Sequence, residues 1–184
     1  MNVLIIDGHQ KTPFASGKLN RTLVAEIKKF FARKKDNKVK TSVVARGYTP
    51  ENERKKFKWA DVIIFQFPVF WFSVPAPMHQ YMQDVYAYGE FYQTKDKPYG
   101  QGGLLQGKSY MFSSTWNSPA EAFGHGFWAG IADPDAALVH LHKAQAFVGL
   151  EKLPSFSCHN VVKGPKIQDY LKGLQKHLTD VFGK

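Results

Sequence analysis

The stretch ADVIIFQFPVFWFSVPAPM, residues 60–78, limits the possible folds more than any other part of this chain. Its first eight residues form an apolar run that is typical of a buried β-strand. The run ends at Phe67, the aromatic residues Phe70, Trp71 and Phe72 follow closely, and two prolines stand near the end of the stretch. The pattern predicts a strand that lies in the core of a sheet and leads into a loop rich in aromatic rings.

Alternating strand-like and helix-like segments extend from this stretch over the whole chain. Further strand-like runs lie at residues 2–8, 38–46, 107–116 and 153–162, and helical patterns lie at residues 17–35, 75–89, 135–149 and 165–183. Apolar strands that are covered on both faces indicate a parallel sheet with helices on each side. We therefore expect an α/β protein: a flavodoxin-like three-layer sandwich with a five-stranded parallel sheet, in one domain that spans residues 1–184.

Composition narrows the classes of function. The net charge is +10, and basic runs lie at residues 28–40 and 53–58. Such runs can bind nucleic acid, membranes or phosphate-bearing small molecules, but a solvated helix end and loop is the simpler interpretation. Because the lysines do not alternate with exposed stacking aromatics, we expect no nucleic-acid groove.

The same composition bears on location. No apolar segment approaches the roughly 18 residues of a membrane span, so we expect none. The N-terminal run is too short for a signal peptide, and the single cysteine, Cys158, permits no intrachain disulfide. We therefore expect a cytoplasmic protein.

Three loops of the expected sheet are placed to bind a ligand. In open parallel sheets, ligands bind beyond the carboxyl ends of the strands, at the point where the strand order reverses. The loops that reach this place are residues 8–20, 67–76 and 113–126.

The first loop, GHQKTPFASGKLNRT, leads from a strand into a helix. Free backbone amides and the dipole at a helix N-terminus form a site for phosphate. Asn20 and Thr22 can add side-chain hydrogen bonds, and Lys11 and Lys18 add positive charge. The alternative is an ordinary helix start with Ser16 as its N-cap.

The other two loops carry rings and polar groups. Rings in residues 67–76 can stack on a flat heterocycle or wall its pocket; alternatively, they cover the core or a dimer interface. In residues 113–126, Thr115, Asn117 and Ser118 offer hydrogen-bonding groups and Trp116 offers a ring.

His125 lies in the same loop, between two glycines. It is a tentative catalytic residue because an exposed histidine titrates near neutral pH. The alternative is a plain loop residue.

Two motifs do not predict the chemistry that their letters suggest. GGLLQGKS, residues 102–109, matches a nucleotide-triphosphate loop, but it leads into a strand rather than into the helix that such a loop requires. His140 and His142 stand two residues apart in a helical pattern and so face different directions. We therefore expect no metal site.

The loop motifs resemble those of a known family. FPVFWFSVPAPMHQYMQDVY, residues 67–86, resembles the P-x-x-W-x-x-x-P-A signature of the flavodoxin-like NAD(P)H:quinone reductases. ADVIIFQFPVFWF, YGQGGLLQGKSYM, TWNSPAEAF and HKAQAFVG are more similar still to the modulator of drug activity B (MdaB) group, in matching order over nearly the whole chain. The segment GHGFWAGIADPD, residues 124–135, departs from that pattern.

The resemblance implies a cofactor, a partner and a set of site residues. Members of this group bind FAD and act as homodimeric NADPH:quinone oxidoreductases. By this resemblance, the FAD pyrophosphate and ribose meet the first loop, the isoalloxazine lies between the aromatic loop and residues 115–118, and Tyr99 contacts FAD from its own or the second subunit. The implied cofactor-binding residues are Ala15, Ser16, Gly17, Lys18, Leu19, Asn20, Arg21, Thr22, Val69, Phe70, Trp71, Phe72, Tyr99, Thr115, Trp116, Asn117 and Ser118.

We therefore expect an FAD-dependent NAD(P)H:quinone oxidoreductase that transfers a hydride from NADPH, or NADH, through the flavin to a quinone by a ping-pong mechanism. The hydride chemistry belongs to the flavin, so the protein has to hold the ring, leave one face open and stabilise negative charge near its N1–C2=O edge. An azo or nitro reductase is one alternative. A non-catalytic flavodoxin-like module that binds flavin or senses redox state is the alternative from a different class.

Overall fold

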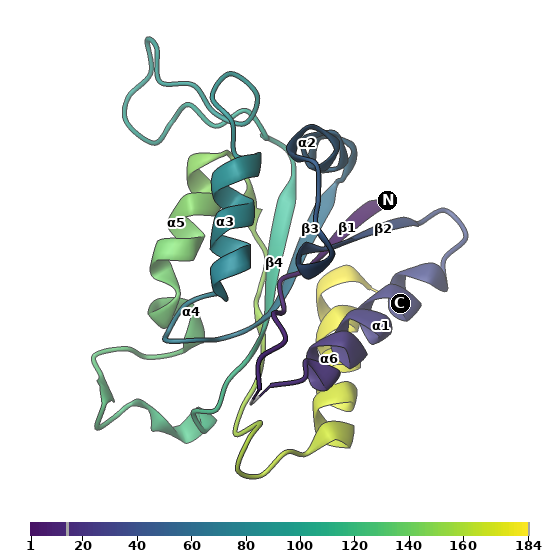
Figure 1. Ribbon diagram of the computed structural model, residues 1–184, viewed down its shortest axis with the longest axis vertical. Coiled ribbons are helices and arrows are strands. Elements are labelled where there is room, and N and C mark those ends of the chain that lie inside the picture. The colour runs from purple at the N-terminus through teal and green to yellow at the C-terminus, as the bar shows by residue number, and fades with distance from the viewer. Residues whose placement is uncertain (14, 184) are drawn as a thin grey trace.

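A parallel β-sheet with helices on both faces forms the centre of the computed structural model, which describes residues 1–13 and 15–183 (Figure 1). The strands are β1 (Asn2–Asp7), β2 (Lys38–Val43), β3 (Val62–Pro68), β4 (Ser109–Thr115), β7 (Glu151–Lys152) and β8 (Phe156–Cys158). Their order is β2-β1-β3-β4-β7, β8 also pairs with β4, and all these pairs are parallel. The direction of chain progression reverses between β1 and β3, which is the point where such sheets bind ligands.

The fifth position of the sheet holds two short strands. β7 pairs with the first residues of β4, and β8 pairs with its last residues. Pro154 lies between them and has no backbone N–H to donate to a ladder. The interruption contains one extra residue, since Ser109 pairs with Glu151 but Ser113 pairs with Phe156. The predicted five-stranded parallel sheet is confirmed, and its fifth strand is broken.

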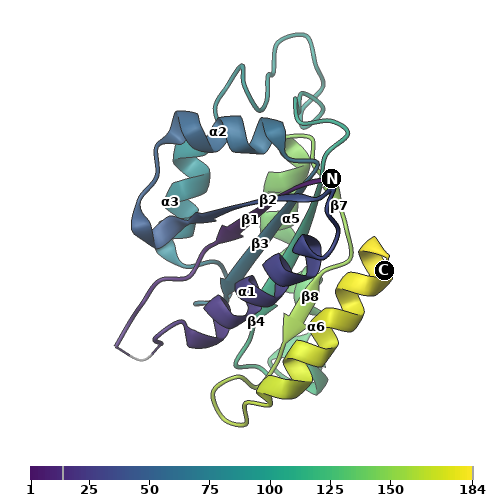
Figure 2. The ribbon, with the colours of Figure 1, turned by 90° about the vertical axis from the view of Figure 1, so that its right-hand side faces the viewer.

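Two helical layers cover the sheet, as Figures 1 and 2 show from two sides. One face carries α1 (Lys18–Ala32) and α6 (Ile167–Phe182); the other carries α2 (Pro50–Trp59), α3 (Ala76–Val85) and α5 (Val139–Phe147), which the short α4 (Pro134–Ala137) precedes.

Each face of the sheet has its own core, because side chains alternate across a strand. Ile5, Ile64 and Met111 face α1 and α6, where they meet Leu23, Ile27 and Leu174. Leu4, Phe65 and Phe112 face the other layer, where they meet Phe57, Tyr81 and Leu141. We propose that the chain is a single domain, since both cores share one sheet.

The helix α2 lies outside the segments that the sequence predicts to be helical. Its residues, PENERKKFKW, are mostly charged, and only Glu53 and Phe57 are buried, so the apolar pattern is too sparse to reveal it. Pro50 in the first turn, together with acidic residues there, favours a helix start. α3 ends at Val85 rather than at Gly89, and a long segment without a named helix or strand then leads to β4.

The loop after β4 holds a 3₁₀ turn (Ala120–Ala122) and two short paired strands, β5 (Phe123–Gly124) and β6 (Trp128–Ala129). A 3₁₀ turn (Val44–Arg46) also follows β2. No helix within residues 1–13 and 15–183 combines the length and apolar character that crossing a bilayer requires.

Candidate active site

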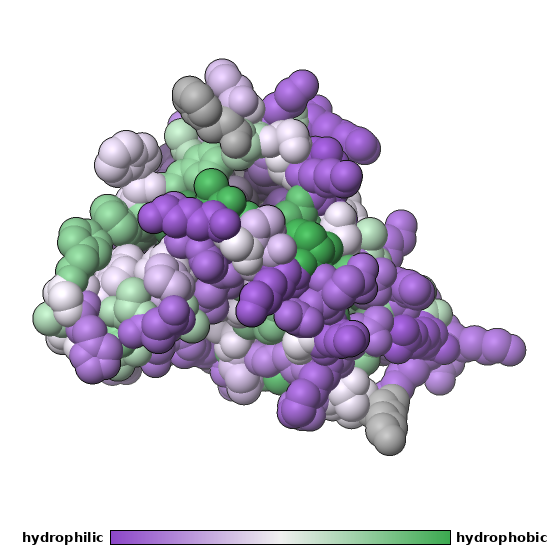
Figure 3. All heavy atoms as spheres, turned by 90° about the horizontal axis from the view of Figure 1, so that it is seen from below, coloured by the Kyte–Doolittle hydropathy of each residue, from purple (hydrophilic) through white to green (hydrophobic). Residues whose placement is uncertain are grey.

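The loops that follow β1, β3 and β4 enclose a cavity of about 290 Å³, which we call the switch-point cavity. It lies at the carboxyl ends of the strands, at the bottom of Figure 1. Figure 3 views the molecule from this end; hydrophilic residues dominate on the right, and apolar and hydrophilic residues mix in the middle. The lining residues are His9, Ala15, Ser16, Gly17, Lys18, Leu19, Asn20, Pro68, Val69, Phe70, Thr115, Asn117, Val161 and Val162.

The structure brings ten of the selected site residues to this cavity: Ala15 to Asn20, Val69, Phe70, Thr115 and Asn117. The other selected residues do not line it: Arg21, Thr22, Trp71, Phe72, Tyr99, Trp116, Ser118 and His125.

Gly17 is the N-cap of α1 and has a left-handed backbone, with φ of 73°. Ser16 is therefore not the N-cap, and no side chain of residues 1–13 and 15–183 caps this helix. A Cβ at position 17 would lie 2.0 Å from Cε1 of His9, so glycine suits both the backbone and the contact. The first-turn amides of α1 have no acceptor within the helix, which is the arrangement that binds phosphate.

His9 is a cavity residue that the sequence analysis does not select. Its side chain is 7% exposed, and its Nε2 atom has no hydrogen-bond partner among the described residues. Leaving a buried polar atom unpaired costs about 1–3 kcal/mol. A group of this kind in a native protein requires an explanation, and a ligand that completes the hydrogen bond is one.

Buried polar side chains fix the start of α1 against the strand ends. Asn20 Nδ2 donates to Asp7 Oδ1 at 2.6 Å, Gln66 Nε2 donates to Asn20 Oδ1 at 3.0 Å, and Ser113 Oγ donates to Gln66 Oε1 at 2.6 Å. All four side chains are buried. The side-chain amide of Asn20 is thus committed within the protein, and its backbone N–H is the group left for a ligand. No sequence pattern indicates this row of hydrogen bonds, because its four side chains lie on four different helices and strands.

Burial raises the pKa of Asp7 above its ordinary value. The backbone N–H of His9, which donates to Asp7 Oδ1, the charges of His9 and Arg21, and the bond from Asn20 reduce this rise. The carboxyl group of Asp7 therefore ionises less readily than one in solvent.

The aromatic loop contains a tight turn with a strained backbone. Phe70 N–H donates to Ser73 O at 2.8 Å, and Ser73 N–H donates to Phe70 O at 3.1 Å. Between them, Trp71 and Phe72 have φ of 48° and 63°. A left-handed backbone costs about 1–2 kcal/mol for each residue other than glycine. Strain of this kind is concentrated at ligand-binding sites.

Only part of this loop can donate hydrogen bonds to a ligand. Val69 N–H already donates to Thr115 O at 2.9 Å, and Phe70 N–H is used in the turn. Among the described residues, the amides of Trp71 and Phe72 have no acceptor. The Trp71 side chain is 93% exposed beside the cavity residue Phe70, so its ring is available to a ligand.

At the end of β4 and in the loop after it, Thr115 and Asn117 line the cavity, whereas Trp116 lies in the core. Trp116 is 2% exposed, and its Nε1 donates to Ser114 Oγ at 2.8 Å. Ser118 Oγ accepts a hydrogen bond from a tryptophan Nε1 of β6 and so ties the loop together. Trp116 and Ser118 are therefore structural residues here.

Three further selected residues lie outside the cavity. Arg21 Nη1 donates to Ser16 O at 2.8 Å and braces the first loop. Thr22 Oγ1 donates to Lys18 O at 2.9 Å within α1. His125 is exposed in the turn between β5 and β6.

Two exposed aromatic residues face other surroundings. The Phe72 ring stacks on Phe127 with a centroid distance of 5.3 Å and meets Trp128 edge-on. Tyr99 is 94% exposed, and its ring lies tilted against that of Phe147, with a centroid distance of 5.8 Å. Tyr99 lies in the segment between α3 and β4, at the top of Figure 1, and thus at the opposite end of the sheet from the switch-point cavity.

Two valines that line the cavity, Val161 and Val162, follow β8. The rule that selected the other loops could have found them, because the fifth strand also ends at this edge. His9 carried no such signal, since its role depends on its contact with Gly17.

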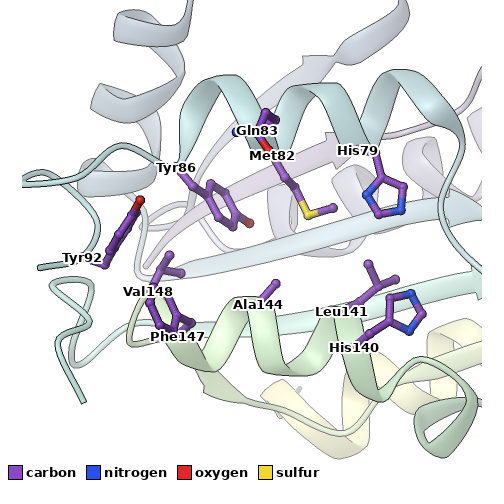
Figure 4. Close-up of a pocket in the computed structure, with 10 residues that line it drawn as sticks. All are labelled: His79, Met82, Gln83, Tyr86, Tyr92, His140, Leu141, Ala144, Phe147 and Val148. Atoms are coloured by element: carbon purple, nitrogen blue, oxygen red, sulfur yellow. The ribbon is translucent and has the colours of Figure 1, made fainter. Parts of the chain in front are cut away.

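A second cavity of about 350 Å³, the α3–α5 groove, lies between α3 and α5 (Figure 4). Ser73 Oγ lies 2.9 Å from His79 Nε2 and 3.0 Å from His140 Nε2 at one end of it. Burial lowers the pKa of His140, and nearby histidines add to the effect. The groove contains none of the selected cofactor residues.

The two motifs that were set aside have structural roles. Lys108 Nζ donates to two backbone carbonyls, and β4 begins at Ser109, so no helix follows the glycines. His142 joins Tyr110 Oη, at 2.8 Å, to Asp135 Oδ1, at 3.0 Å. Within residues 1–13 and 15–183, no three histidine, cysteine or acidic side chains are grouped to hold a metal ion.

Residues 1–180 match a protein family whose description is 'flavodoxin-like fold'. The chain belongs to the flavodoxin-like fold family. Within it, the chain is 39% identical over 194 residues to the NADPH:quinone oxidoreductase MdaB of Haemophilus influenzae, and the match covers 100% of both proteins. The resemblance to the MdaB group that the loop motifs indicate is confirmed.

Solved structures of the flavodoxin-like fold also match. A Klebsiella pneumoniae protein assigned as a quinone reductase has a TM-score of 0.80 and 24% identity, covering 97% of this chain and 83% of that one. An FMN-dependent NADH-azoreductase from Bacillus anthracis, in complex with FMN, has a TM-score of 0.77 and 13% identity over 100% of both chains. At these identities the structures support the fold alone.

Proposed function

We propose that this chain is a flavin-dependent NAD(P)H:quinone oxidoreductase of the MdaB type. The observation that carries the proposal is the switch-point cavity, where helix-start amides, a strained aromatic turn and polar side chains meet. Flavodoxin binds FMN at the β1/β3 switch point of the same strand order. The full-length identity to a quinone oxidoreductase supports the same activity.

The first loop suits the phosphates of a flavin nucleotide. The amides of residues 18–20 are free at the start of α1, and Lys18 adds positive charge. Gly17 lets the backbone approach closely because it has no side chain. Arg21 and Thr22 act on this loop indirectly, through their bonds to its backbone and to α1.

The other two loops suit the isoalloxazine ring. We propose that Val69, Phe70 and Trp71 lie along it, and that Thr115 and Asn117 approach its other edge. The amides of the strained turn would then meet the negative charge that a reduced ring carries, without reorganising.

We propose FAD as the cofactor, as the resemblance to the MdaB group implies. FMN, which the Bacillus anthracis azoreductase binds, is the alternative. Release of the bound cofactor by heating, followed by chromatography, distinguishes FAD from FMN. Released FAD supports the proposal, and FMN alone contradicts it.

When bound, the flavin supplies hydride transfer from NADPH or NADH and two-electron reduction of a quinone. The residues of this chain hold the ring and leave one face open, so reductant and quinone would use the same place in turn. This predicts ping-pong kinetics. No proton transfer is assigned to His125, because it is exposed and outside the cavity.

We propose that the protein is a homodimer in which Tyr99 serves the partner's cavity. Tyr99 is almost fully exposed and lies at the opposite end of the sheet from the switch-point cavity of its own chain. A second copy can therefore bring it to a cavity that its own chain cannot. Analytical ultracentrifugation tests the dimer; a monomer that retains full activity contradicts this arrangement.

Steady-state kinetics with NADPH and menadione test the function. Parallel lines in double-reciprocal plots support the ping-pong mechanism, and intersecting lines contradict it. A protein that binds flavin but leaves it oxidised under NADPH would be the non-catalytic module instead. An azo dye assayed as acceptor beside menadione tests the azoreductase alternative, which the fold shared with an azoreductase favours.

A further inference from the structure

A cavity of about 520 Å³ lies at the carboxyl ends of β1 and β2, on the other side of His9 from the switch-point cavity. We call it the basic pocket. Among the described residues, His9 alone lines both cavities. The lining residues of the basic pocket are Asp7, His9, Lys11, Arg21, Val24, Val43, Ala45 and Arg46.

Positive charge dominates the basic pocket. Lys11, Arg21 and Arg46 line it from three different elements: the first loop, α1 and the turn after β2. Within residues 1–13 and 15–183, Lys11 and Arg46 form no ion pair. Cations that face one cavity repel each other, and an anion between them removes that repulsion.

The acidic residue that lines the pocket does not neutralise these cations by contact. Asp7 is 4% exposed, and its Oδ1 accepts hydrogen bonds from the backbone N–H of His9 and from Asn20. The Nη1 atom of Arg21 donates to Ser16 O, and its other guanidinium nitrogens can donate to a ligand.

The second observation that points to a ligand is His9 itself. Its side chain is 93% buried in the wall between the two cavities, and its Nε2 has no partner among the described residues. A phosphate oxygen in the basic pocket would supply a hydrogen-bond partner for Nε2. Positive side chains thus line this cavity, and the buried unpaired nitrogen belongs to a residue of its wall.

We propose that the basic pocket binds a nucleotide phosphate that lies outside the switch-point cavity. Arginine is the residue of choice for phosphate because its planar fork donates two parallel hydrogen bonds. In dinucleotide-binding sheets, an arginine near the second strand receives the phosphate on a ribose, and Arg46 follows β2 here. The phosphate belongs to the reductant NADPH or to the ADP half of FAD, and its identity as one of these rests on the proposed function.

Direct binding tests the proposal without an activity assay. The probe is 2′,5′-ADP, which carries a ribose 2′-phosphate, and its binding to the isolated protein is measured by isothermal titration calorimetry. Arg46→Ala removes the arginine that lines the pocket from the turn after β2. Arg33→Ala is the matched control, because Arg33 is exposed at the opposite end of α1.

Two arms separate the sources of the phosphate. If NADPH supplies the phosphate, Arg46→Ala weakens the binding of 2′,5′-ADP about tenfold, as expected for the loss of one charge-assisted hydrogen bond. Arg33→Ala leaves that affinity unchanged. If FAD supplies the phosphate, Arg46→Ala weakens the binding of FAD, but not that of FMN, in a fluorescence titration. Unchanged affinity for 2′,5′-ADP, FAD and FMN relative to Arg33→Ala overturns the proposal. A protein that binds 2′,5′-ADP through Arg46 but reduces no quinone would overturn the proposed function and leave this site standing.

Discussion

Replacement of Gly17 by alanine tests the contact on which the first loop depends. Gly17 has φ of 73°, and an added Cβ would lie 2.0–2.4 Å from three atoms of the His9 ring. A left-handed alanine costs about 1–2 kcal/mol, and overpacking a buried contact costs about 1–3 kcal/mol more. Because the ring of His9 is buried and cannot easily move away, we expect a loss of about 2–5 kcal/mol in the free energy of unfolding.

A matched control isolates the contact from the backbone. Gly107 has φ of 74°, and nothing lies within 4 Å of the place where its Cβ would be. Gly107→Ala should therefore cost only the backbone part, about 1–2 kcal/mol. Urea unfolding, followed by circular dichroism, gives both free energies, provided that the m-values agree.

The cofactor gives a second measurement on the same variants. Gly17→Ala should also retain less flavin on purification, since the shifted loop presents its amides differently, whereas Gly107→Ala should retain a full complement. His9→Ala should restore much of the stability lost in Gly17→Ala when the two are combined. Equal losses in Gly17→Ala and Gly107→Ala would refute the argument.

Three other substitutions follow from the structure. Asp7→Asn should raise the melting temperature at pH 7 and have a smaller effect near pH 4. Burial raises the pKa of Asp7, so the stability contributed by its protonated carboxyl group is present at low pH and lost as the pH rises through that pKa. Equal changes in melting temperature at both pH values would count against a buried carboxyl group. Asp135→Asn should destabilise the protein by about 1–3 kcal/mol at pH 7, because burial raises the pKa of Asp135 but hydrogen bonds from His142 and Lys152 outweigh it and lower the pKa overall. That stabilisation is lost as the pH falls below about 4, so thermal melts from pH 3 to 7 should show the deficit shrinking toward acid, and a constant deficit argues otherwise. Trp71→Ala should leave the unfolding midpoint unchanged, since the ring is 93% exposed, but should weaken flavin binding severalfold in a fluorescence titration through loss of a stacking surface; unchanged flavin affinity and turnover would remove this ring from the site.

The fold was predictable because its central strands are uninterrupted apolar runs in the sequence. The runs at residues 2–8 and 60–67 are buried on both faces, and both became central strands. α2 was missed because charged residues fill it and tertiary packing of Phe57 decides its position. The break in the fifth strand depends on Pro154 and on one extra residue, which only the pairing with β4 reveals.

The site was predictable at the level of loops and less so at the level of side chains. The carboxyl-end rule selected the right loops, and ten of the selected residues line the cavity. It could not tell that Trp116 faces inward, because neighbouring residues in an extended chain point in opposite directions and the direction depends on the register. Nor could it foresee that Asn20 is bonded within the protein, since its partners Asp7 and Gln66 are distant in sequence.

The absorption spectrum of the freshly purified protein tests most directly whether the switch-point cavity holds a flavin. We predict a yellow protein with about one FAD per chain, whose colour bleaches under NADPH without oxygen and returns when menadione is added. A protein that stays colourless after incubation with excess FAD and FMN would contradict the account.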